Sequence, residues 1–538
     1  MPAYCLSYRE TNYYSSLISD YLDQKEELKP FYHRFPSIEN FEAQIKDKKD
    51  VFSADKRELL VKVLEQQYSE IEKGEEVSAN IKALSNENTF TVTTGHQLNL
   101  FTGPLYFLYK IVSTINLASA LKKEYAKNDF VPVYWMATED HDFEEINYFN
   151  LNGKKFKWNS QQKQAGEDAV GELHTEGLEE VFNLFSAEIG GGKNAEDLKD
   201  LFKSAYLEHS NLTDATRYLA HQLFKEYGLV ILDAHNKELK AEFIPYVEKE
   251  LFEKVSHTTT ISVAEKLEQL DYGIQVNPRE INLFYLNAGL RERIIEKEGS
   301  FYVNETEISW NKEEIQNEIQ DFPERFSPNV MLRPLYQEVI LPNLCYIGGG
   351  GELAYWFELK EMFEELKVPF PILLLRNSAL IETSKQNKKR GKLDISQSEL
   401  FLKQHELINR KVRKISNIDI DFSPQKGHLV KQFQQLYELA EKTDPTFLGA
   451  VKAQEVKQLK GLEHLENRLL LAQKRKLKDE VSRIAALQNE LFPNKSLQER
   501  QTNFSEMYLE FGQALIPTLI ENLDPLELKF KILTFGEK

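Results

Sequence analysis

One stretch of the chain, residues 90–147, constrains its fold more than any other. It begins with a short run rich in β-branched residues, Phe90 to Thr94, which breaks at Gly95. Apolar residues at helical spacing follow Pro104, and proline is favoured in the first turn of a helix. The next run, VPVYWM, is almost wholly apolar, as in a strand that is buried on both faces. A strand, a helix and a strand at this spacing predict one right-handed crossover of a parallel sheet.

The first loop of this unit, residues 95–103, should lie at the carboxyl end of the sheet, where open α/β sheets usually bind ligands. The helix behind it has no acidic residue before Glu124, so its free amide groups and positive dipole end could receive an anion. A capped core helix beside one satisfied surface histidine is the competing interpretation. The candidate binding residues here are Gly95, His96, Gln97, Thr102, Gly103 and Lys110.

The second loop carries four consecutive titratable residues, which are Glu139, Asp140, His141 and Asp142. Such a cluster could hold a substrate ammonium, act as acid and base, or bind a metal. It could equally be structural, because Asp142 and Glu145 have the spacing of a helix capping box. The residues alone do not decide between these interpretations.

A second unit of strand, loop and helix follows later in the chain. NLCYI predicts a strand, Gly348–Gly351 a loop, and the residues from Glu352 onward an amphipathic helix. Such a loop usually suggests a phosphate cradle, but Glu352 in the first turn would repel an anion. An amine or a sugar hydroxyl is the better expected ligand, unless the glycines only permit close helix packing. Arg376 follows the apolar run FPILLL, where its charge needs a partner.

Composition limits the class of protein. A chain of 538 residues is too long for one core, so two or three domains are expected. The formal charge of −18 argues against a general nucleic-acid binder, because phosphates would be repelled. Two cysteines, Cys5 and Cys345, exclude a disulfide framework and a cysteine-based zinc site. With no apolar signal core and no stretch of membrane-spanning length, the expected location is the cytoplasm, without membrane contact.

The rest of the sequence predicts a core that is interrupted by insertions. The run GLVILD predicts a core strand that ends at Asp233, and both Asp233 and His235 could join the site, although such residues more often cap the next helix. Alternating residues between Ile261 and Trp310 predict hairpin strands. The expected divisions are 1–150 (first part of the core), 151–212 (helical and loop insertion), 213–260 (return to the core), 261–325 (β-rich insertion), 326–380 (last part of the core) and 381–538 (helical domain).

The helical domain has the pattern of a coiled coil. Two helices are expected on either side of Asp444-Pro445. The second carries apolar residues from Leu459 to Leu491 at steps of three and four, with one longer gap. A helix from about residue 447 to 491 would be on the order of 65 Å long at 1.5 Å per residue. Dimerisation is the expected use of such a seam.

Four segments, taken together and in order, resemble a known family. They are TGHQLNLFTGPLYFLYK, PVYWMATEDHDFEEIN, SPNVMLRPLYQEVILPNLCYIGGGGELAYW and LQER. The chain resembles, over nearly its whole length, the bacillithiol biosynthesis enzyme BshC family, the proposed cysteine ligase of that pathway. The resemblance implies an α/β fold with a Rossmann-like parallel-sheet core, connecting-peptide insertions and a C-terminal α-helical coiled coil that forms a homodimer. The implied reaction adds L-cysteine to the amine of glucosaminyl malate and forms an amide.

The resemblance and the chemistry of the loops together give the candidate site. His96 is a departure, because many relatives have a second glutamine there. The catalytic candidates are His141, Asp142, Asp140 and His96. The substrate-binding candidates are Gly95, Gln97, Thr102, Gly103, Lys110, Trp135, Glu139, Asn329, Arg333, Gly349, Glu352, Tyr355, Trp356 and Arg376. No residue is assigned to a metal.

Amide synthesis needs an activated carboxyl group held near a deprotonated amine. We expect the helix at Pro104 to hold the anionic partner, His141 to titrate, and Arg333 or Arg376 to pair with carboxylates. ATP is the expected activating nucleotide, although the His-x-Gly-His signature of class I synthetases is absent. Two other functions are compatible with the sequence: a nucleotidyltransferase-like ligase of the same fold, and a non-catalytic scaffold built on the coiled coil.

Overall fold

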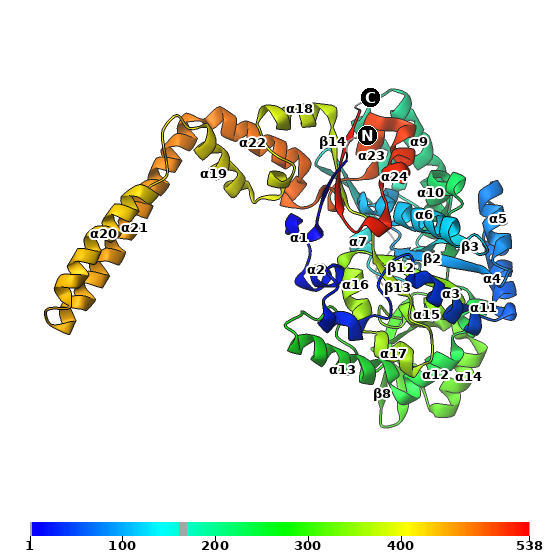
Figure 1. The fold of residues 1–538 in the computed structure, drawn as a ribbon. Coiled ribbons are helices and arrows are strands. Elements are labelled where there is room, and N and C mark those ends of the chain that lie inside the picture. Colours follow the sequence, from blue (N-terminus) through cyan, green and yellow to red (C-terminus); the bar gives the residue numbers. More distant parts are fainter. Residues whose placement is uncertain (1–2, 161–168, 537–538) are drawn as a thin grey trace. The chain divides into compact units, whose positions relative to one another are not determined.

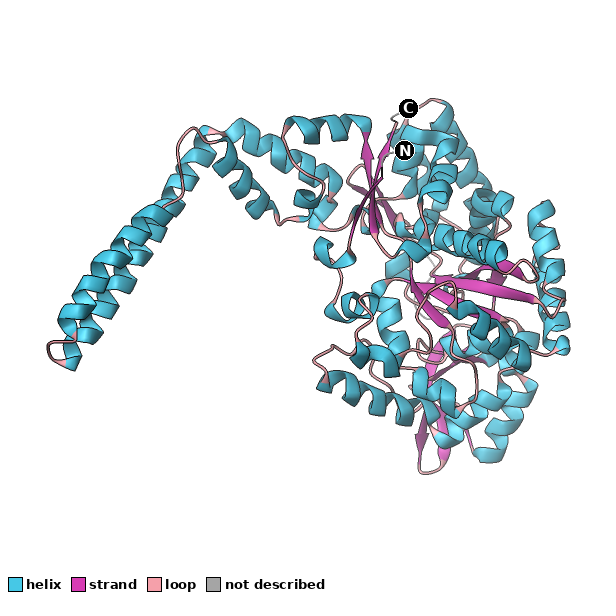
Figure 2. Ribbon diagram, viewed as in Figure 1, coloured by secondary structure: helices cyan, strands magenta, loops and turns pink. Residues whose placement is uncertain are grey.

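The computed structural model describes residues 3–160 and 169–536, and the chain divides into two compact units. The first comprises the residues up to Ile381 together with those from Ser496 onward, and the second comprises Glu382–Lys495. Figures 1 and 2 show that the first unit mixes strands and helices, whereas the second is helical. No helix in the described ranges is both long and apolar enough to cross a membrane.

A five-stranded parallel sheet forms the centre of the first unit. β2 (Thr89–His96) pairs with β3 (Asp129–Met136) along its whole length, and α6 (Tyr106–Glu124) packs against both strands. The predicted strand, helix and strand of a parallel sheet are therefore confirmed. The order is β13-β12-β2-β3-β6, where the remaining strands are β6 (Val230–Asp233), β12 (Asn343–Gly348) and β13 (Ile372–Leu375).

Helices cover both faces of this sheet, since every residue of β2 and of β12 is buried. One layer of the core packs Phe90 and Val92 of β2 against Leu117 of α6 and Phe41 of α3. The helices that contact the strands, besides α6, are α3 (Asn40–Val51), α4 (Ala54–Gln67), α5 (Glu75–Ala83), α10 (Leu212–Phe224) and α16 (Gly350–Phe357). Two further helices, α15 (Arg333–Ile340) and α17 (Lys360–Glu365), flank β12 and α16 along the chain.

Two insertions interrupt the core. The first follows β3 and contains α7 (Phe143–Ile146), the hairpin of β4 (Tyr148–Leu151) and β5 (Lys154–Lys157), α8 (Leu178–Ile189) and α9 (Lys193–Tyr206). The second follows β6 and contains α11 (Lys237–Ala241), α12 (Ile244–Glu253), α13 (Val255–Gln269), β7 (Leu283–Asn287), β8 (Leu290–Lys297), β9 (Ser300–Val303), β10 (Ser309–Trp310), α14 (Lys312–Asp321) and β11 (Phe326–Pro328). Its strands form an antiparallel sheet in the order β10-β9-β8-β7-β11. The hairpin strands of this sheet were predicted. β11, however, lies within residues 326–380, which were predicted to belong to the core.

The chain returns to the first unit after the second one. β15 (Phe530–Phe535) lies between β1 (Ala3–Leu6) and β14 (Ala379–Thr383) in a three-stranded sheet. Before it, α23 (Phe504–Phe511) contacts α9, and α24 (Leu515–Asn522) contacts α6. The predicted division 381–538 thus contains two parts, the helical unit and the residues from Ser496 onward, which complete the sheet and core of the first unit.

The second unit contains α18 (Ser384–Lys392), α19 (Gln404–Ile415), α20 (Ser423–Ala440), α21 (Pro445–Lys476) and α22 (Lys478–Leu491). α20 and α21 are the two helices predicted on either side of Asp444-Pro445, and they lie side by side as a hairpin (Figure 1). Phe433, Ala440 and Val451 form the buried cluster of this hairpin. The single helix expected from 447 to 491 is wrong, because Leu477 leaves the helical conformation with φ −100° and ψ 28°. There α19 packs against both α21 and α22, so the apolar positions near Leu477 are covered within the unit.

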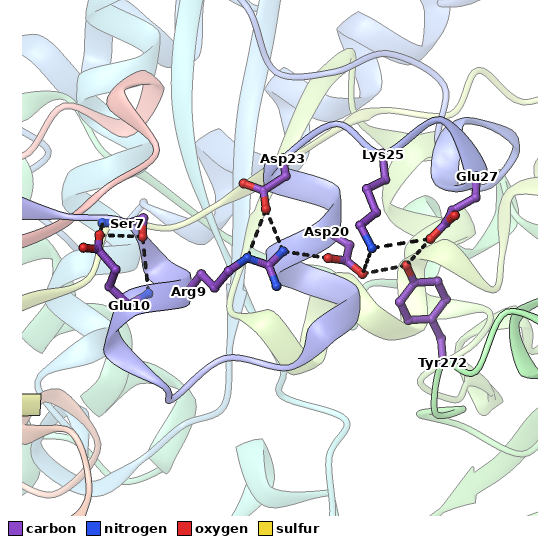
Figure 3. Close-up of polar contacts among 8 residues, drawn as sticks. All are labelled: Ser7, Arg9, Glu10, Asp20, Asp23, Lys25, Glu27 and Tyr272. Carbon is purple, nitrogen blue, oxygen red and sulfur yellow. Dashed lines mark hydrogen bonds and ion pairs between the residues drawn. The ribbon is translucent and has the colours of Figure 1, made fainter. Parts of the chain in front are cut away.

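A network of charges ties the N-terminal helices α1 (Tyr8–Thr11) and α2 (Ser16–Leu22) to the second insertion (Figure 3). Arg9 and Lys25 lie 2.6 and 2.9 Å from the carboxylate of Asp20, to which the hydroxyl of Tyr272 donates at 2.8 Å. Burial alone would raise the pKa of Asp20, but the hydrogen bonds from Lys25 and Arg9 outweigh it and lower the pKa to about 2. Asp20 is therefore ionised and joins two distant segments.

We expect Asp20→Asn to lower the free energy of unfolding by about 1–3 kcal/mol, because the buried hydroxyl of Tyr272 and the half-exposed cations Arg9 and Lys25 lose a charged acceptor. The stabilisation is complete above the ordinary carboxyl pKa of 3.8 and is lost as the pH falls towards 2. In urea unfolding, the difference in free energy of unfolding between the parent protein and the variant should thus be larger at pH 7 than at pH 3. An equal difference at both values would contradict the assignment. Asp23→Asn is the control, since Asp23 is exposed and bonds only Arg9 in this network.

Candidate active site

A cavity of about 490 Å³ lies at the carboxyl edge of the central sheet. All five strands lead into it: His96 ends β2, Ala137–Asp140 follow β3, His235 follows β6, Gly349 follows β12 and Arg376 follows β13. This is the edge at which open α/β sheets bind ligands. The volume lies within the range of about 300–1,000 Å³ that is usual for small-molecule sites.

The structure brings most of the predicted site residues together. Those that line the cavity are Gly95, His96, Gln97, Lys110, Trp135, Glu139, Asp140, Asn329, Arg333, Gly349, Glu352, Tyr355 and Arg376. Those that lie outside its lining are Thr102, Gly103, His141, Asp142 and Trp356. Trp356 is buried and stacks on Tyr346, a residue of the cavity wall, so it supports the wall from behind.

The first turn of α6 is covered, whereas the sequence predicted that it would be open to an anion. The backbone N–H of Leu105 donates to the carbonyl oxygen of Thr502 at 2.7 Å. The side-chain amide of Asn503 donates to the carbonyl oxygens of Phe101 and Gly103 at 2.7 and 2.6 Å. A ligand would have to displace this returning segment, which the local pattern around Pro104 could not reveal.

The surroundings of His96 oppose a role as acid or base near neutral pH. Its ring is buried and packs against Tyr106 and Phe107, with centroid distances of 5.5 and 5.0 Å. Burial, followed by the charge of Lys110, lowers the pKa of His96 to about 3. His96 is therefore a neutral residue of the cavity wall and not the predicted acid or base. This agrees with the departure at this position, where many relatives have a glutamine.

His141 and Asp142 lie outside the residues that line the cavity. A guanidinium nitrogen of Arg291 in β8 donates to Nδ1 of His141 at 2.9 Å, so this ring nitrogen is an acceptor already in use. Asp142 is exposed, and its side chain makes no cap bond to α7. This geometry does not support the predicted role of His141 as the titrating group. It does not support the competing interpretation, a capping box with Asp142, either.

Glu352 is engaged within the protein. Its carboxylate accepts hydrogen bonds from the backbone N–H of Gly349 at 2.6 Å, from Lys110 at 2.8 Å and from the Tyr346 hydroxyl at 3.0 Å. Burial would raise the pKa of Glu352, but the charge of Lys110 and the bond from Gly349 lower it. An ionised carboxylate thus occupies the start of α16, where a phosphate would otherwise bind. This agrees with the prediction that the glycine loop is not a phosphate cradle.

Arg376 has the partner that its buried charge requires, as predicted. One of its Nη atoms lies 2.7 Å from a carboxylate oxygen of Glu499, and the side chains are 3% and 0% exposed. Glu499 belongs to the LQER motif, whose role the sequence left open, and it also accepts from the hydroxyl of Ser378 at 3.1 Å. The next residue, Arg500, lines the cavity. The motif therefore neutralises the charge of Arg376 through Glu499 and places Arg500 in the cavity wall.

Arg333 faces the cavity with neutral partners. Its guanidinium donates to the hydroxyl of Tyr355 at 3.0 Å and to the side chain of Gln337 at 3.2 Å. It also lies 5.5 Å from the centre of the Tyr346 ring. No carboxylate pairs with it among the residues that the structure describes. These neutral groups fix the guanidinium in position without cancelling its charge.

Glu139 is the centre of a buried network. It accepts from Nδ1 of His235 at 2.9 Å, from Lys240 at 2.6 Å and from the hydroxyl of Ser327 at 2.6 Å. Burial would raise the pKa of Glu139, but the charge of Lys240 and the bond from His235 lower it to about 2. The carboxylate is thus ionised, and three groups of the protein already donate to it.

Several cavity residues were not predicted, among them Tyr106, Arg291, Tyr336, Tyr346 and Arg500. Four of them, Tyr106, Tyr336, Tyr346 and Arg500, lie inside the recognised segments, but only the fold shows that they face the cavity. Arg291 comes from a hairpin of the second insertion and carries no local signal beyond a charged residue in a strand. His235 was weighed from its position after a core strand and then left out of the predicted site.

Comparison with known proteins covers the whole chain. Residues 1–377 match the family described as "Bacillithiol biosynthesis BshC, N-terminal Rossmann-like domain", and residues 379–535 match its C-terminal coiled-coil domain. A protein of Christiangramia forsetii is 68% identical over 538 residues, which is all of both chains. One of Flavobacterium johnsoniae is 57% identical over 99% of this chain and 100% of its own. One of Bacillus cereus is 27% identical over 94% and 95%.

Each of these three relatives is named as a candidate cysteine ligase, BshC. The family's N-terminal domain covers most of the first unit, including its parallel sheet, and the coiled-coil domain covers the helical unit and most of the segment that follows it. The chain belongs to the BshC family of bacillithiol biosynthesis, and its fold is a Rossmann-like domain followed by a coiled-coil domain.

Proposed function

We propose that this chain is a cysteine ligase that joins the carboxyl group of L-cysteine to the amine of glucosaminyl malate as an amide. The full-length similarity to relatives named as candidate cysteine ligases supports the proposal. So does a small-molecule cavity at the ligand-binding edge of the sheet. We place the reaction in the cytoplasm, where the free thiols of Cys5 and Cys345 would stay reduced.

The charge of the cavity is the observation that carries the proposal. Its wall contains five cationic side chains, which are Lys110, Arg291, Arg333, Arg376 and Arg500, and three carboxylates, which are Glu139, Asp140 and Glu352. Lys110 pairs with Glu352, and Arg376 pairs with Glu499. Three arginines therefore remain without a carboxylate partner among the described residues. The malate part of the proposed substrate brings two carboxylates, which guanidinium groups bind as planar forks.

Asp140 is the carboxylate that is free to receive the substrate ammonium. It accepts from the side chain of Gln97 at 2.8 Å and from the backbone N–H of His141 at 2.7 Å, both of which are neutral donors. Burial would raise the pKa of Asp140, but the hydrogen bonds from His141 and Gln97 lower it to about 2. The cavity thus offers a carboxylate with no described lysine or arginine within ion-pair distance, although the charge of Arg291 acts on it, beside Arg333 and Arg500, as a zwitterionic amino sugar conjugate requires.

The carboxyl group of cysteine must be activated, and we propose ATP as the activating co-substrate. Glu352 fills the start of α16, and the segment at residues 502–503 covers the first turn of α6. Neither helix end therefore offers the usual phosphate cradle. Binding of the triphosphate would then depend on arginines, and Arg500 is the exposed one among those lining the cavity.

The direct test is ligation by the purified full-length protein. L-Cysteine, glucosaminyl malate and magnesium ATP are incubated with it, and the amide is detected by mass spectrometry. We expect product only when all three substrates are present. Absence of the amide, together with no accumulation of glucosaminyl malate in cells that lack the gene, would overturn the proposal.

We further propose that the second unit forms a homodimer. Large apolar side chains are exposed on α20 and α21, where a monomer would leave them in water: Val430, Leu436, Leu439, Phe447, Leu448, Val456, Leu465 and Leu471. Val456 and Leu471 lie within about 60° of each other on the helix surface at 3.6 residues per turn.

Replacing both Val456 and Leu471 by glutamate should convert the dimer to a monomer, because two charges would be buried in the interface. Light scattering after size exclusion measures the mass. The exposed Gln458→Glu variant, about 200° from Val456 on the helix surface, is the control for added charge on the same helix and should remain dimeric. A dimeric double variant, or a monomeric parent protein, would refute the proposed interface.

A further inference from the structure

The loop after β6 holds His235 at the cavity wall. The backbone N–H of His235 donates to Oδ1 of Asp233 at 3.0 Å, and the hydroxyl of Thr138 donates to the same oxygen at 2.6 Å. The hydroxyl of Tyr336 donates to the carbonyl oxygen of Ala234 at 2.8 Å. The side chain of His235 is 27% exposed and lines the cavity. The imidazole is therefore fixed by its own loop and still reachable by a ligand.

The bond to Glu139 decides which ring nitrogen of His235 is free. An ionised carboxylate only accepts hydrogen bonds, so Nδ1 of His235, 2.9 Å from Glu139, carries the hydrogen. In the neutral ring the lone pair then lies on Nε2. The carboxylate of Glu172 is 3.9 Å from Nε2, which is beyond hydrogen-bond distance, and its side chain is 62% exposed. Nε2 is thus a free acceptor.

His235 differs in this respect from the other histidines near the site. His96 is held neutral by burial and by the charge of Lys110. His141 lies outside the lining, and its Nδ1 accepts from Arg291. Among the described residues, His235 is the histidine that combines a place in the cavity wall, a carboxylate at Nδ1 and an open Nε2. A base oriented in this way by a third group is a recurring catalytic arrangement.

We propose that Nε2 of His235 is the general base that removes a proton from the ammonium group of the amine substrate, an inference that rests on the proposed function. One N–H bond of the ammonium breaks, its electron pair stays on the nitrogen, and the proton binds Nε2. The resulting imidazolium is stabilised by the carboxylate of Glu139 and releases its proton to solvent. The amine then has the lone pair that attack on an activated acyl group requires.

The charged groups that face His235 are Glu139, Asp233 and Glu172, which are negative, and Lys240, which is positive. Burial lowers the pKa of His235, but the hydrogen bond and charge of Glu139 outweigh it, so the net shift is upward. The neutral ring is the active form. The rate should therefore rise with pH through the pKa of His235, and loss of the charge at Glu139 should move that rise to lower pH.

The test compares His235→Asn with the parent protein, using kcat/KM for glucosaminyl malate across a pH series. The asparagine amide can still donate to Glu139, but it has no basic nitrogen. We expect a loss of about 10²–10⁴-fold at neutral pH. The loss should shrink as the pH rises, because the amine then deprotonates in solution. Added imidazole should restore part of the rate to a His235→Gly variant.

Glu139→Gln provides a second measurement, in which the acid limb of the pH profile should shift downward. His405→Gln, at an exposed histidine of the second unit, is the control for which no change is expected. Full activity of His235→Asn with an unaltered pH profile would overturn this inference and leave the ligase proposal intact. A constant loss at all pH values would also overturn it, because that marks a structural role. No amide from the parent protein would overturn both.

Discussion

Replacing Arg333 by methionine should weaken binding of the proposed substrate, glucosaminyl malate, by about 10- to 100-fold, since hydrogen bonds to charged groups contribute about 1.5–3 kcal/mol. Arg333 is the cavity arginine whose partners, Tyr355 and Gln337, are both neutral. Its charge is therefore available to a substrate carboxylate. Methionine keeps the apolar stem that packs beside the Tyr346 ring, so the wall should stay in place. Calorimetric titration gives the Kd, and steady-state kinetics gives KM and kcat.

Two matched variants test whether the weaker binding comes from the lost guanidinium group at this position. Arg333→Lys keeps the charge but loses the planar fork, so its affinity should fall between those of the parent and of Arg333→Met. Arg293→Met makes the same change at an arginine of β8 that does not line the cavity, and it should bind like the parent. Equal Kd values for Arg333→Met and the parent would show that the malate carboxylates bind elsewhere.

Glu499→Ala should lower the free energy of unfolding of the first unit by about 3–5 kcal/mol, as is usual when one partner of a buried ion pair is removed. Arg376 would be left 3% exposed and unneutralised in the wall. The hydroxyl of Ser378 and the backbone N–H of Ala379 would also lose an acceptor. Urea unfolding followed by tryptophan fluorescence measures the change, because Trp135 and Trp356 both belong to this unit.

The double variant Arg376→Met/Glu499→Leu separates the cost of an unpaired charge from that of lost packing. Replacing both partners by apolar side chains is often neutral for stability. We therefore expect most of the stability to return while substrate binding stays weak, because Arg376 lines the cavity. Glu87→Ala, which removes one partner of the exposed pair with Lys49, should change stability little. A Glu499→Ala protein as stable as the parent would contradict the importance of the pair.

The sequence predicted those parts of the fold that have a local period. The strand from Phe90, the helix after Pro104 and the glycine loop before Glu352 each carry their own pattern, and the structure contains each of them. The convergence of their loops on one cavity was also predictable, because carboxyl ends of parallel strands share one edge. Arg376 was correctly expected to need a partner, because a guanidinium after an apolar run is otherwise buried alone.

The remaining features depend on contacts between distant residues. The sequence around Pro104 does not indicate that Thr502 and Asn503 cover the first turn of α6. Nothing near His141 shows that an arginine from the second insertion bonds to its ring. The break of the long helix at Leu477 likewise reflects packing of α19 and not a proline or glycine. The period of apolar residues indicates which face of a helix or strand is buried, but it does not indicate which other element packs against that face.

The position of Glu499 has a consequence for how the protein is made. Arg376 and Glu499 are 123 residues apart, and the whole helical unit is synthesised between them. A nascent chain on the ribosome therefore carries an unfinished pocket until its final segment has emerged. Closure of so long a loop is a slow step in folding, compared with the formation of a hairpin. An interrupted translation product would thus be unable to bind substrate, even though every strand of its central sheet was already complete.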